Sequence, residues 1–333
     1  MKKILVTGAG GYVGSVLVKK LINHGYFVRA LDVYMYEKNP FREIDYKAQR
    51  GKLEIFKADI RSEKLMDFAL MDMDVVIHLA CISNDPSFDL NPALGKSVNL
   101  DAFGPLVRMA KTSGVKRFIN ASSSSVYGVS EDYEVTEQST CDPLTDYSKF
   151  KLETESILKS YDCPDFTTVS VRSATVCGYS PRQRLDVIVN ILTNHAVNLG
   201  KITVHGGNQK RPNIHIEDLT DLYVRLVEAD KLKISGEVFN FGGPNYTVNE
   251  LADLVRRTVK SKDVEIFYME TNDPRSYHIS SEKVFKKLGV KPSRSIEDAV
   301  RYLELAINSG LLPNSLTDSK YFNIEKMKEI KIA

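Results

Sequence analysis

The chain has 333 residues, of which 43% are hydrophobic and 26% charged, and its formal net charge at pH 7 is +2. This is an ordinary soluble globular composition, and the near balance of charge gives no electrostatic case for a nucleic-acid partner. No apolar run approaches the ~20 residues that span a bilayer, so no membrane partner is expected. The four cysteines form no CxxC pair, so we predict neither a metal site nor a disulfide framework, and we expect a reducing, cytoplasmic location.

The chain opens with a short buried strand, residues 4–6, that leads directly into a glycine-rich turn. Gly8, Gly11 and Gly14 are spaced as G-x-x-G-x-x-G, and a helical stripe that Gly25 closes follows them. Glycines allow the backbone to turn tightly and to approach a pyrophosphate, whose charge a helix N-terminus favours. This segment therefore predicts a dinucleotide-binding loop.

The second strand, residues 27–32, ends in Asp32, 18 residues after Gly14. A carboxylate at this position suits the ribose hydroxyls of adenosine and repels a 2′-phosphate. Val33 and Tyr34 follow, so no Arg or Lys stands there to pair with such a phosphate. The sequence therefore favours NAD over NADP.

Four more strands are predicted further along the chain, at residues 53–60, 75–80, 117–121 and 166–172, with helical patterns between them. Strands that alternate with helices form a parallel sheet covered on both faces, and ligands bind beyond the carboxyl ends of its strands. The last segment, residues 320–333, combines several lysines with Glu325 and Glu329. We interpret it as a solvated terminal helix.

A run of four serines, Ser122 to Ser125, is followed by Tyr147 and Lys151. At i,i+4 on a helix, the Tyr and the Lys share a face. A neighbouring ammonium favours the phenolate and lowers the pKa of the phenol from its usual ~10, so that the Tyr can take the proton of an alcohol. A Ser hydroxyl can hydrogen-bond the same alcohol. These residues therefore predict a proton-transfer site for a carbinol.

Together these features resemble the extended short-chain dehydrogenase/reductase family, in its NAD-dependent nucleotide-sugar epimerase/dehydratase branch, over roughly residues 2–305. Further matching motifs are Asp59-Ile60, His78-Leu79-Ala80, Asn99, Val126-Tyr127-Gly128, the stretch from Arg211 to His215 with Asp218, and residues 273–277 around Arg275. The resemblance implies an α/β fold: a Rossmann doubly wound parallel sheet in residues 1–172 and a smaller C-terminal α/β substrate lobe in residues 173–333. Some segments of the second part are expected to return to the Rossmann core.

The resemblance also implies roles for individual residues. The catalytic residues would be Ser123, Tyr147 and Lys151. The NAD-binding residues would be Gly8, Gly11, Tyr12, Val13, Asp32, Asp59, Ile60, Leu79, Ala80, Asn99, Tyr147 and Lys151. Substrate contacts are expected from Ser83, Ser124, Thr175, Arg184, Arg211 and Arg275, because an arginine fork suits diphosphate oxygens. Thr175 stands where the family often has Asn, and this departure puts one diphosphate contact in doubt.

Ser124 and Ser125 stand where related 4,6-dehydratases carry Asp-Glu, and elimination of water needs such an acid and base. The resemblance therefore implies reversible oxidation at C4 of a nucleoside-diphosphate sugar, by a 4-epimerase or a 4-dehydrogenase, in surface polysaccharide biosynthesis. A 4-dehydrogenase that holds NAD tightly and acts on a GDP-heptose-like sugar fits equally well.

A non-catalytic NAD-binding scaffold or sensor is an alternative of another class, and the intact set of Ser123, Tyr147 and Lys151 argues against it. Asp32 disfavours reduction of a freed 4-keto sugar by NADPH.

The oligomeric state is indicated by two helical patterns, near residues 93–113 and 146–159, which correspond to the helices through which relatives form dimers. A stripe of apolar residues on the first pattern either forms that interface or packs against the sheet; it consists of Leu100, Phe103, Val107 and Ala110. We expect a homodimer.

Overall fold

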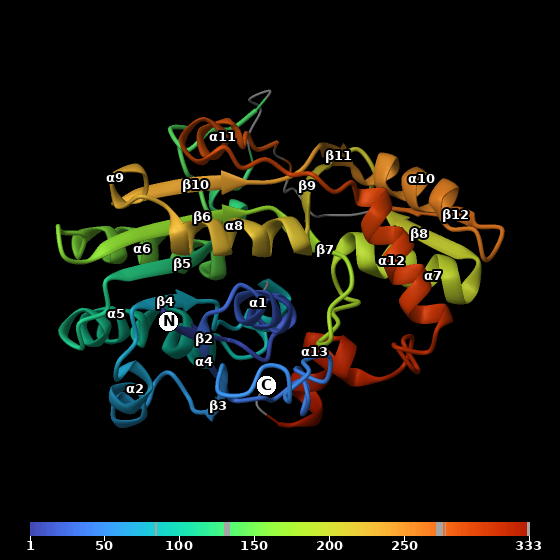
Figure 1. Ribbon diagram of the computed structural model, residues 1–333. Helices are drawn as coiled ribbons and strands as arrows, with labels where there is room; N and C mark the ends of the chain where they lie inside the picture. Colours follow the sequence, from blue (N-terminus) through green and yellow to red (C-terminus); the bar gives the residue numbers. More distant parts are fainter. Residues whose placement is uncertain (84, 130–133, 271–275, 277, 332–333) are drawn as a thin grey trace.

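The computed structural model describes residues 1–83, 85–129, 134–270, 276 and 278–331 (Figure 1). Its largest element is a seven-stranded sheet with the strand order β10-β6-β5-β4-β1-β2-β3. All strand pairings in this sheet are parallel. The strands are β1 (Lys3–Thr7), β2 (Phe27–Asp32), β3 (Leu53–Lys57), β4 (Val75–His78), β5 (Arg117–Ser123), β6 (Thr167–Ser173) and β10 (Glu237–Phe241). The predicted Rossmann-like parallel sheet is confirmed.

Helices cover both faces of this sheet, because side chains alternate between the faces along each strand. Ile4 and Val6 of β1 pack in one apolar cluster with α1 (Tyr12–Asn23) and α8 (Ile216–Glu228). Leu5, between them, packs on the other face with α2 (Glu63–Leu70), α5 (Phe103–Thr112) and α6 (Asp146–Ser160). Buried apolar residues on both faces of the same strand are what a fully covered parallel sheet requires.

The second half of the chain adds two small sheets and returns once to the large one. One small sheet has the order β11-β9-β7 and the other pairs β12 with β8. Their strands are β7 (Thr175–Cys177), β8 (Lys201–His205), β9 (Lys210–His215), β11 (Asn245–Thr247) and β12 (Glu265–Met269). Their core is shared with α7 (Ile188–Leu199), α10 (Val248–Thr258) and α12 (Ile296–Asn308). Because β10 joins the large sheet beside β6, a segment of the second half belongs to that sheet, while the boundary at residues 172–173 stays a prediction.

The helical pattern near residues 93–113 differs from expectation, since it is broken into α4 (Pro92–Lys96), a π-helical turn at Ser97–Asp101, and α5. Three residues of its apolar stripe, Phe103, Val107 and Ala110, are at most 1% exposed and pack in the core against the sheet. The stripe is thus core in this chain and gives no support to an interface. The homodimer stays a prediction.

The C-terminal segment is not a solvated helix, so that expectation was wrong. It forms a 3₁₀ turn at Ser319–Tyr321 and then α13 (Asn323–Glu329). Tyr321, Asn323 and Met327 are buried, and α13 lies against α3 (Asp85–Asp89) of the first half of the chain. In Figure 1 this red segment descends from α12 towards the blue half of the molecule.

Elsewhere, α9 spans Lys231–Ile234 and α11 spans Glu282–Leu288. No helix in the described ranges is long and apolar enough to cross a membrane.

A buried ion pair joins α6 to the centre of the sheet. Arg172 of β6 and Glu155 of α6 are 6% and 5% exposed, and Arg172 Nη2 lies 2.7 Å from Glu155 Oε2. Arg172 also donates to the hydroxyl of Tyr127, at 2.9 Å, and Ser122 donates to Glu155. Burial disfavours the guanidinium charge, but Glu155 outweighs burial and raises the pKa of Arg172. The network therefore stabilises the charges that fix α6 on the sheet.

We predict that Glu155→Gln lowers the free energy of unfolding by about 3–5 kcal/mol, because it leaves the Arg172 charge buried without its partner. Urea unfolding monitored by circular dichroism measures the change. The matched control is Asp146→Asn, which removes an exposed ion pair with Lys149 on the same helix and should cost ~1 kcal/mol or less. Equal effects of the two substitutions would contradict the role assigned to the buried pair.

Candidate active site

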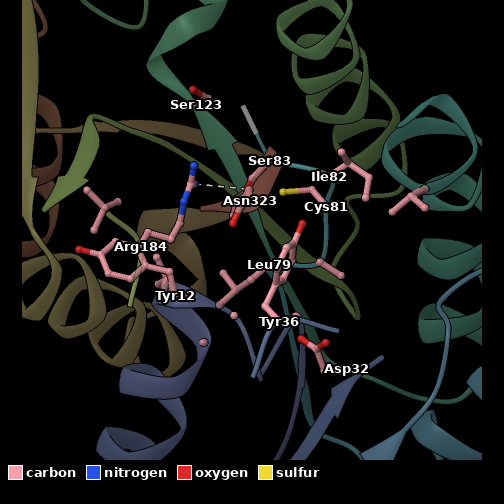
Figure 2. A pocket seen from close by; sticks show the side chains of 18 of the residues that line it. Tyr12, Asp32, Tyr36, Leu79, Cys81, Ile82, Ser83, Ser123, Arg184 and Asn323 are labelled. Atoms are coloured by element: carbon pink, nitrogen blue, oxygen red, sulfur yellow. Dashed lines mark hydrogen bonds between the residues drawn. The ribbon is translucent and has the colours of Figure 1, made fainter. Parts of the chain in front are cut away.

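A cavity of about 590 Å³ lies where the carboxyl ends of the central strands meet. Its walls come from the loops that follow β1, β2, β4 and β5, from the start of α6, from residues 173–187, and from the C-terminal segment. Figure 2 shows Ser123 at one end of this cavity and Asp32 at the other. The edge is the one at which parallel α/β sheets bind ligands.

The glycine loop after β1 is built so tightly that side chains would not fit. A Cβ on Gly8, whose φ is +72°, would lie 2.6 Å from the backbone nitrogen of Ala80. A Cβ on Gly14 would lie 2.2 Å from the carbonyl oxygen of Gly8. The loop turns directly into α1, so Tyr12 and Val13 line the cavity at the helix N-terminus. This arrangement fits the pyrophosphate of a dinucleotide.

Asp32 is held beside this loop by two backbone amides. Gly10 N donates to Asp32 Oδ2 at 3.0 Å, and Tyr34 N donates to Oδ1 at 2.7 Å. Burial raises the pKa of Asp32, although both amides act to lower it. Further along the same wall, Asp59 pairs with Arg61 at 2.6 Å, next to Ile60. The donors and acceptors of this end of the cavity suit an adenosine, so the residues fit NAD.

Tyr147 and Lys151 line the other end of the cavity from one face of α6. The ammonium nitrogen of Lys151 lies 5.8 Å from the centroid of the Tyr147 ring and donates to the carbonyl of Ala121 at 2.6 Å. Burial raises the pKa of Tyr147 well above its usual value, and the charges of Cys81 and Asp85 add to this. The sequence predicted that Lys151 lowers the pKa of Tyr147. In the protein without ligands this is not the dominant effect, because removal of the phenol from water raises the pKa by more.

Ser123 ends β5 and lines the same cavity as Tyr147. The Ser123 hydroxyl acts to lower the pKa of the Tyr147 phenol, against the larger effect of burial. The hydroxyl also accepts a hydrogen bond from Ser125 N at 3.1 Å, where a 3₁₀ turn, Ser124–Tyr127, begins. The structure thus brings Ser123, Tyr147 and Lys151 together in one wall.

The predicted substrate contacts divide into two groups. Ser83, Ser124, Thr175 and Arg184 line the cavity. Arg184 Nη1 donates to the Ser83 hydroxyl at 3.3 Å (Figure 2). Arg211 is not among the lining residues and lies on β9, opposite Tyr246 of β11. Arg275 lies outside the described residues.

Asn99 is the one predicted NAD-binding residue that does not line the cavity. Its side chain is buried and makes two hydrogen bonds with the backbone of Ile82, accepting from the nitrogen at 2.8 Å and donating to the oxygen at 3.0 Å. Both functional groups of the amide are therefore used by the protein itself. Asn99 holds the loop after β4, which carries Ser83, and the π-helical turn at Ser97–Asp101 brings it there.

Several polar residues that line the cavity were not among the predicted site residues, notably Tyr36, Asp85, Arg182 and Asn323. Arg182 lies with its guanidinium 4.2 Å from the centroid of the Tyr36 ring, and its charge acts on Asp32. Asp85 accepts a hydrogen bond from the Thr145 hydroxyl and faces the same cavity as Tyr147. The Pro181–Arg184 stretch of the sequence and the polar loop after β4 were weak signals for these residues, whereas nothing pointed to Asn323.

The fold and this cavity, with its glycine loop at one end and a Ser, Tyr and Lys at the other, are those of a dinucleotide-dependent α/β enzyme. The model of the NAD dependent epimerase/dehydratase family matches residues 4–242, and the chain belongs to this family. NAD is accordingly its cofactor.

Relatives and solved structures agree with this membership. The chain is 26% identical to the UDP-glucose 4-epimerase of Lactobacillus helveticus, over 90% of this chain and 94% of that protein. It is 28% identical to the low-salt glycan biosynthesis protein Agl12 of Haloferax volcanii, over 89% and 96%. The solved UDP-glucose 4-epimerase of Thermotoga maritima superposes with a TM-score of 0.80 at 26% identity, covering 93% of this chain and 99% of that one.

We predict that Gly14→Ala abolishes NAD binding measurable by calorimetry, because its Cβ would collide with the Gly8 carbonyl and force the loop apart. Gly104→Ala is the matched control, since it also lies in a helix but has open space at its Cβ. It should bind NAD normally and gain up to ~1 kcal/mol of stability from helix propensity. Normal NAD binding by Gly14→Ala would contradict the role of the tight glycine loop in binding the dinucleotide.

The raised pKa of Tyr147 gives a second prediction. A pKa above the usual ~10 keeps the phenol protonated at neutral pH, so its phenolate forms only as the pH rises beyond that value. Tyrosine is labelled with carbon-13 at the ring carbon that bears the hydroxyl, and the Tyr147 resonance is assigned through Tyr147→Phe. This resonance should titrate above the ~10 of a free tyrosine. A Tyr147 resonance that titrates below that value would contradict the dominance of burial.

Proposed function

We propose that the protein catalyses reversible oxidation at C4 of a nucleoside-diphosphate sugar, most directly as a 4-epimerase. The observation that carries this proposal is that Ser123, Tyr147 and Lys151 line one cavity together, and that the glycine loop and Asp32 line the far end of the same cavity. The names of several relatives support reaction at C4 of the sugar. Besides the 4-epimerases of Lactobacillus helveticus and Thermotoga maritima, a solved UDP-glucuronic acid 4-epimerase of Bacillus cereus, bound to UDP-glucuronic acid and NAD, is 26% identical with a TM-score of 0.82.

The proposed step uses Tyr147 as the base and Ser123 as the partner of the reacting oxygen. Tyr147, as phenolate, takes the proton of the sugar 4-hydroxyl, and the cationic Lys151 on the same helical face favours that phenolate. Ser123 donates a hydrogen bond to the oxygen as negative charge develops on it. Bound NAD would supply the hydride acceptor for C4 and, for epimerisation, the same hydride on the way back. In that case the 4-keto sugar turns its other face towards the cofactor site, C4 regains the hydride on this face, and Tyr147 returns the proton to the 4-oxygen.

The sugar nucleotide is proposed to contact Ser83, Ser124, Thr175 and Arg184, which share the cavity with the catalytic set. Burial disfavours the Arg184 charge, but Asp186 outweighs burial and raises the pKa of Arg184. A guanidinium that stays charged while buried is suited to bind a diphosphate. Arg211 and Arg275 stay proposed as further diphosphate ligands on the resemblance alone.

Elimination of water is a second candidate, and one observation favours it. Ser124 and Ser125 lack the acid that the related dehydratases carry, but the Asp85 carboxylate reaches the same cavity. The Thr145 hydroxyl bonds Asp85 and lies 3.0 Å from the Ser148 hydroxyl, which donates to Ser125 at 2.9 Å. A chain of hydroxyl groups therefore connects a carboxylate with the position at which the dehydratases carry their acid.

We expect UDP-, GDP-, CDP- or dTDP-hexose to be converted into its C4 epimer, detected by NMR, with Tyr147→Phe at least ~100-fold slower, because the base is lost. Tyr302→Phe, an exposed tyrosine on α12, is the matched control and should be unchanged. A dehydrogenase would instead accumulate a 4-keto sugar with stoichiometric NADH, and a dehydratase a 6-deoxy-4-keto sugar. Near-wild-type turnover by Tyr147→Phe would overturn the proposal, and NAD binding without turnover of any sugar would favour a scaffold.

A further inference from the structure

The C-terminal segment contributes a wall to the active-site cavity. After α12 the chain returns along an apolar cluster in which Leu312 and Tyr321 pack with Leu185 and Leu303. The backbone nitrogen of Leu185 donates to the carbonyl of Tyr321 at 2.9 Å. The segment is thereby docked on the same loop that carries Arg182 and Arg184. It lies beyond residue 305, where the resemblance to the family's motifs ends.

Asn323, at the start of α13, is the residue of this segment that enters the cavity. It is 1% exposed and lies beside Ser83 and near Arg184 in Figure 2. Its Oδ1 accepts a hydrogen bond from Arg182 Nη2, and its Nδ2 donates to the Ser83 hydroxyl at 3.1 Å. Its backbone nitrogen donates to Asp186 Oδ2 at 2.9 Å. One residue therefore contacts both the loop after β4 and the loop after β7.

The charges around Asn323 explain why a neutral amide is useful at this position. Arg182 and Arg184 are two buried cations, and burial together with the Arg184 charge lowers the pKa of Arg182 to about 10. Asp186 pairs with Arg184 at 2.8 Å. Among the residues that the structure describes, none forms a salt bridge with Arg182, and the carbonyl oxygen of Asn323 provides an acceptor for its guanidinium. Removing the Asn323 side chain would leave this Arg182 nitrogen buried without that acceptor, and the Ser83 hydroxyl would keep the hydrogen bond from Arg184 but lose the one from Asn323.

We propose that Asn323 is a positioning residue of the site, which latches the C-terminal segment to the cavity and fixes Arg182 near the dinucleotide and Ser83 near the sugar. Arg182 lies over the ring of Tyr36 and lines the cavity with Asp32, whose carboxylate its charge favours. Ser83 is bonded to Arg184, at the substrate end. The positioning of Arg182 near the dinucleotide does not depend on the proposed function, whereas the positioning of Ser83 near the sugar rests on it.

The test compares Asn323→Ala and Asn323→Asp with wild type by stopped-flow fluorescence of bound NADH. Asn323→Ala should release NADH about tenfold faster, as expected for loss of a hydrogen bond to a charged group. The carboxylate of Asn323→Asp keeps an acceptor for Arg182, so its release rate should return to within about threefold of wild type. With the active sugar nucleotide, both variants should raise KM more than they lower kcat, because both lose the donor to Ser83.

The matched control is Asn198→Ala, which removes a 3.1 Å hydrogen bond to Ser315 of the same C-terminal segment but lies away from the cavity. It should leave the NADH release rate and KM unchanged, and thermal unfolding reports any general loss of stability in each variant. Wild-type release from Asn323→Ala, or equal acceleration in Asn198→Ala, would overturn the inference. If no sugar nucleotide turns over, the proposed function fails, and the release rates still decide the role of Asn323.

Discussion

Glu155 lies two helical turns after Tyr147 on α6, and its carboxylate is held at the centre of the sheet by Arg172 and Ser122. Ser122 is the neighbour of Ser123, so one buried network fixes both the helix that carries Tyr147, the proposed base, and the strand that carries Ser123. A buried charge pair is costly unless it is fully hydrogen-bonded, and Tyr127 completes this one. The geometry of the catalytic wall depends on this anchoring, because Tyr147 and Ser123 come from segments 24 residues apart in the chain.

In the protein without ligands, the environment of Tyr147 disfavours the phenolate that the proposed proton transfer requires. Burial and the charges of Cys81 and Asp85 raise the pKa of Tyr147, while Arg184 and the Ser123 hydroxyl act against them. A base of this kind works only where cations and hydrogen-bond donors favour its charged form. Lys151 and Arg184 line the same cavity as Tyr147. Their positive charges favour the phenolate form of Tyr147, which the proposed reaction needs.

The parts of the fold and site that were predictable from the sequence are those encoded by local patterns. The strand at residues 27–32 has the predicted bounds, and the glycine loop, Asp32 and the Tyr147/Lys151 face lie where spacing placed them. Each depends on residues close together in the chain. Asn323 escaped prediction because its partners are distant in sequence: it meets Ser83 across 240 positions. The lysines of residues 320–333 also suggested a solvated helix, since the sequence does not show that Tyr321 and Met327 turn inwards.

Asn99 and Arg211 show a different limit. Family motifs predicted a ligand contact for both, yet in this structure the Asn99 side chain is hydrogen-bonded to the backbone of Ile82, and Arg211 lies on β9 and does not line the cavity. A motif identifies a residue's position, whereas its contacts depend on the surrounding loops. The role of Asn99 is thus to hold the loop that carries Ser83.

The central claim, that hydrogen leaves and returns to C4 as hydride while Tyr147 handles only the hydroxyl proton, is tested most directly by isotope tracing. The sugar nucleotide that turns over is prepared with deuterium at C4, and the products are analysed by NMR and mass spectrometry. The account predicts that the label stays at C4 of the inverted sugar, or moves to the reduced cofactor if the net reaction is dehydrogenation. Loss of the label to water during turnover would contradict it.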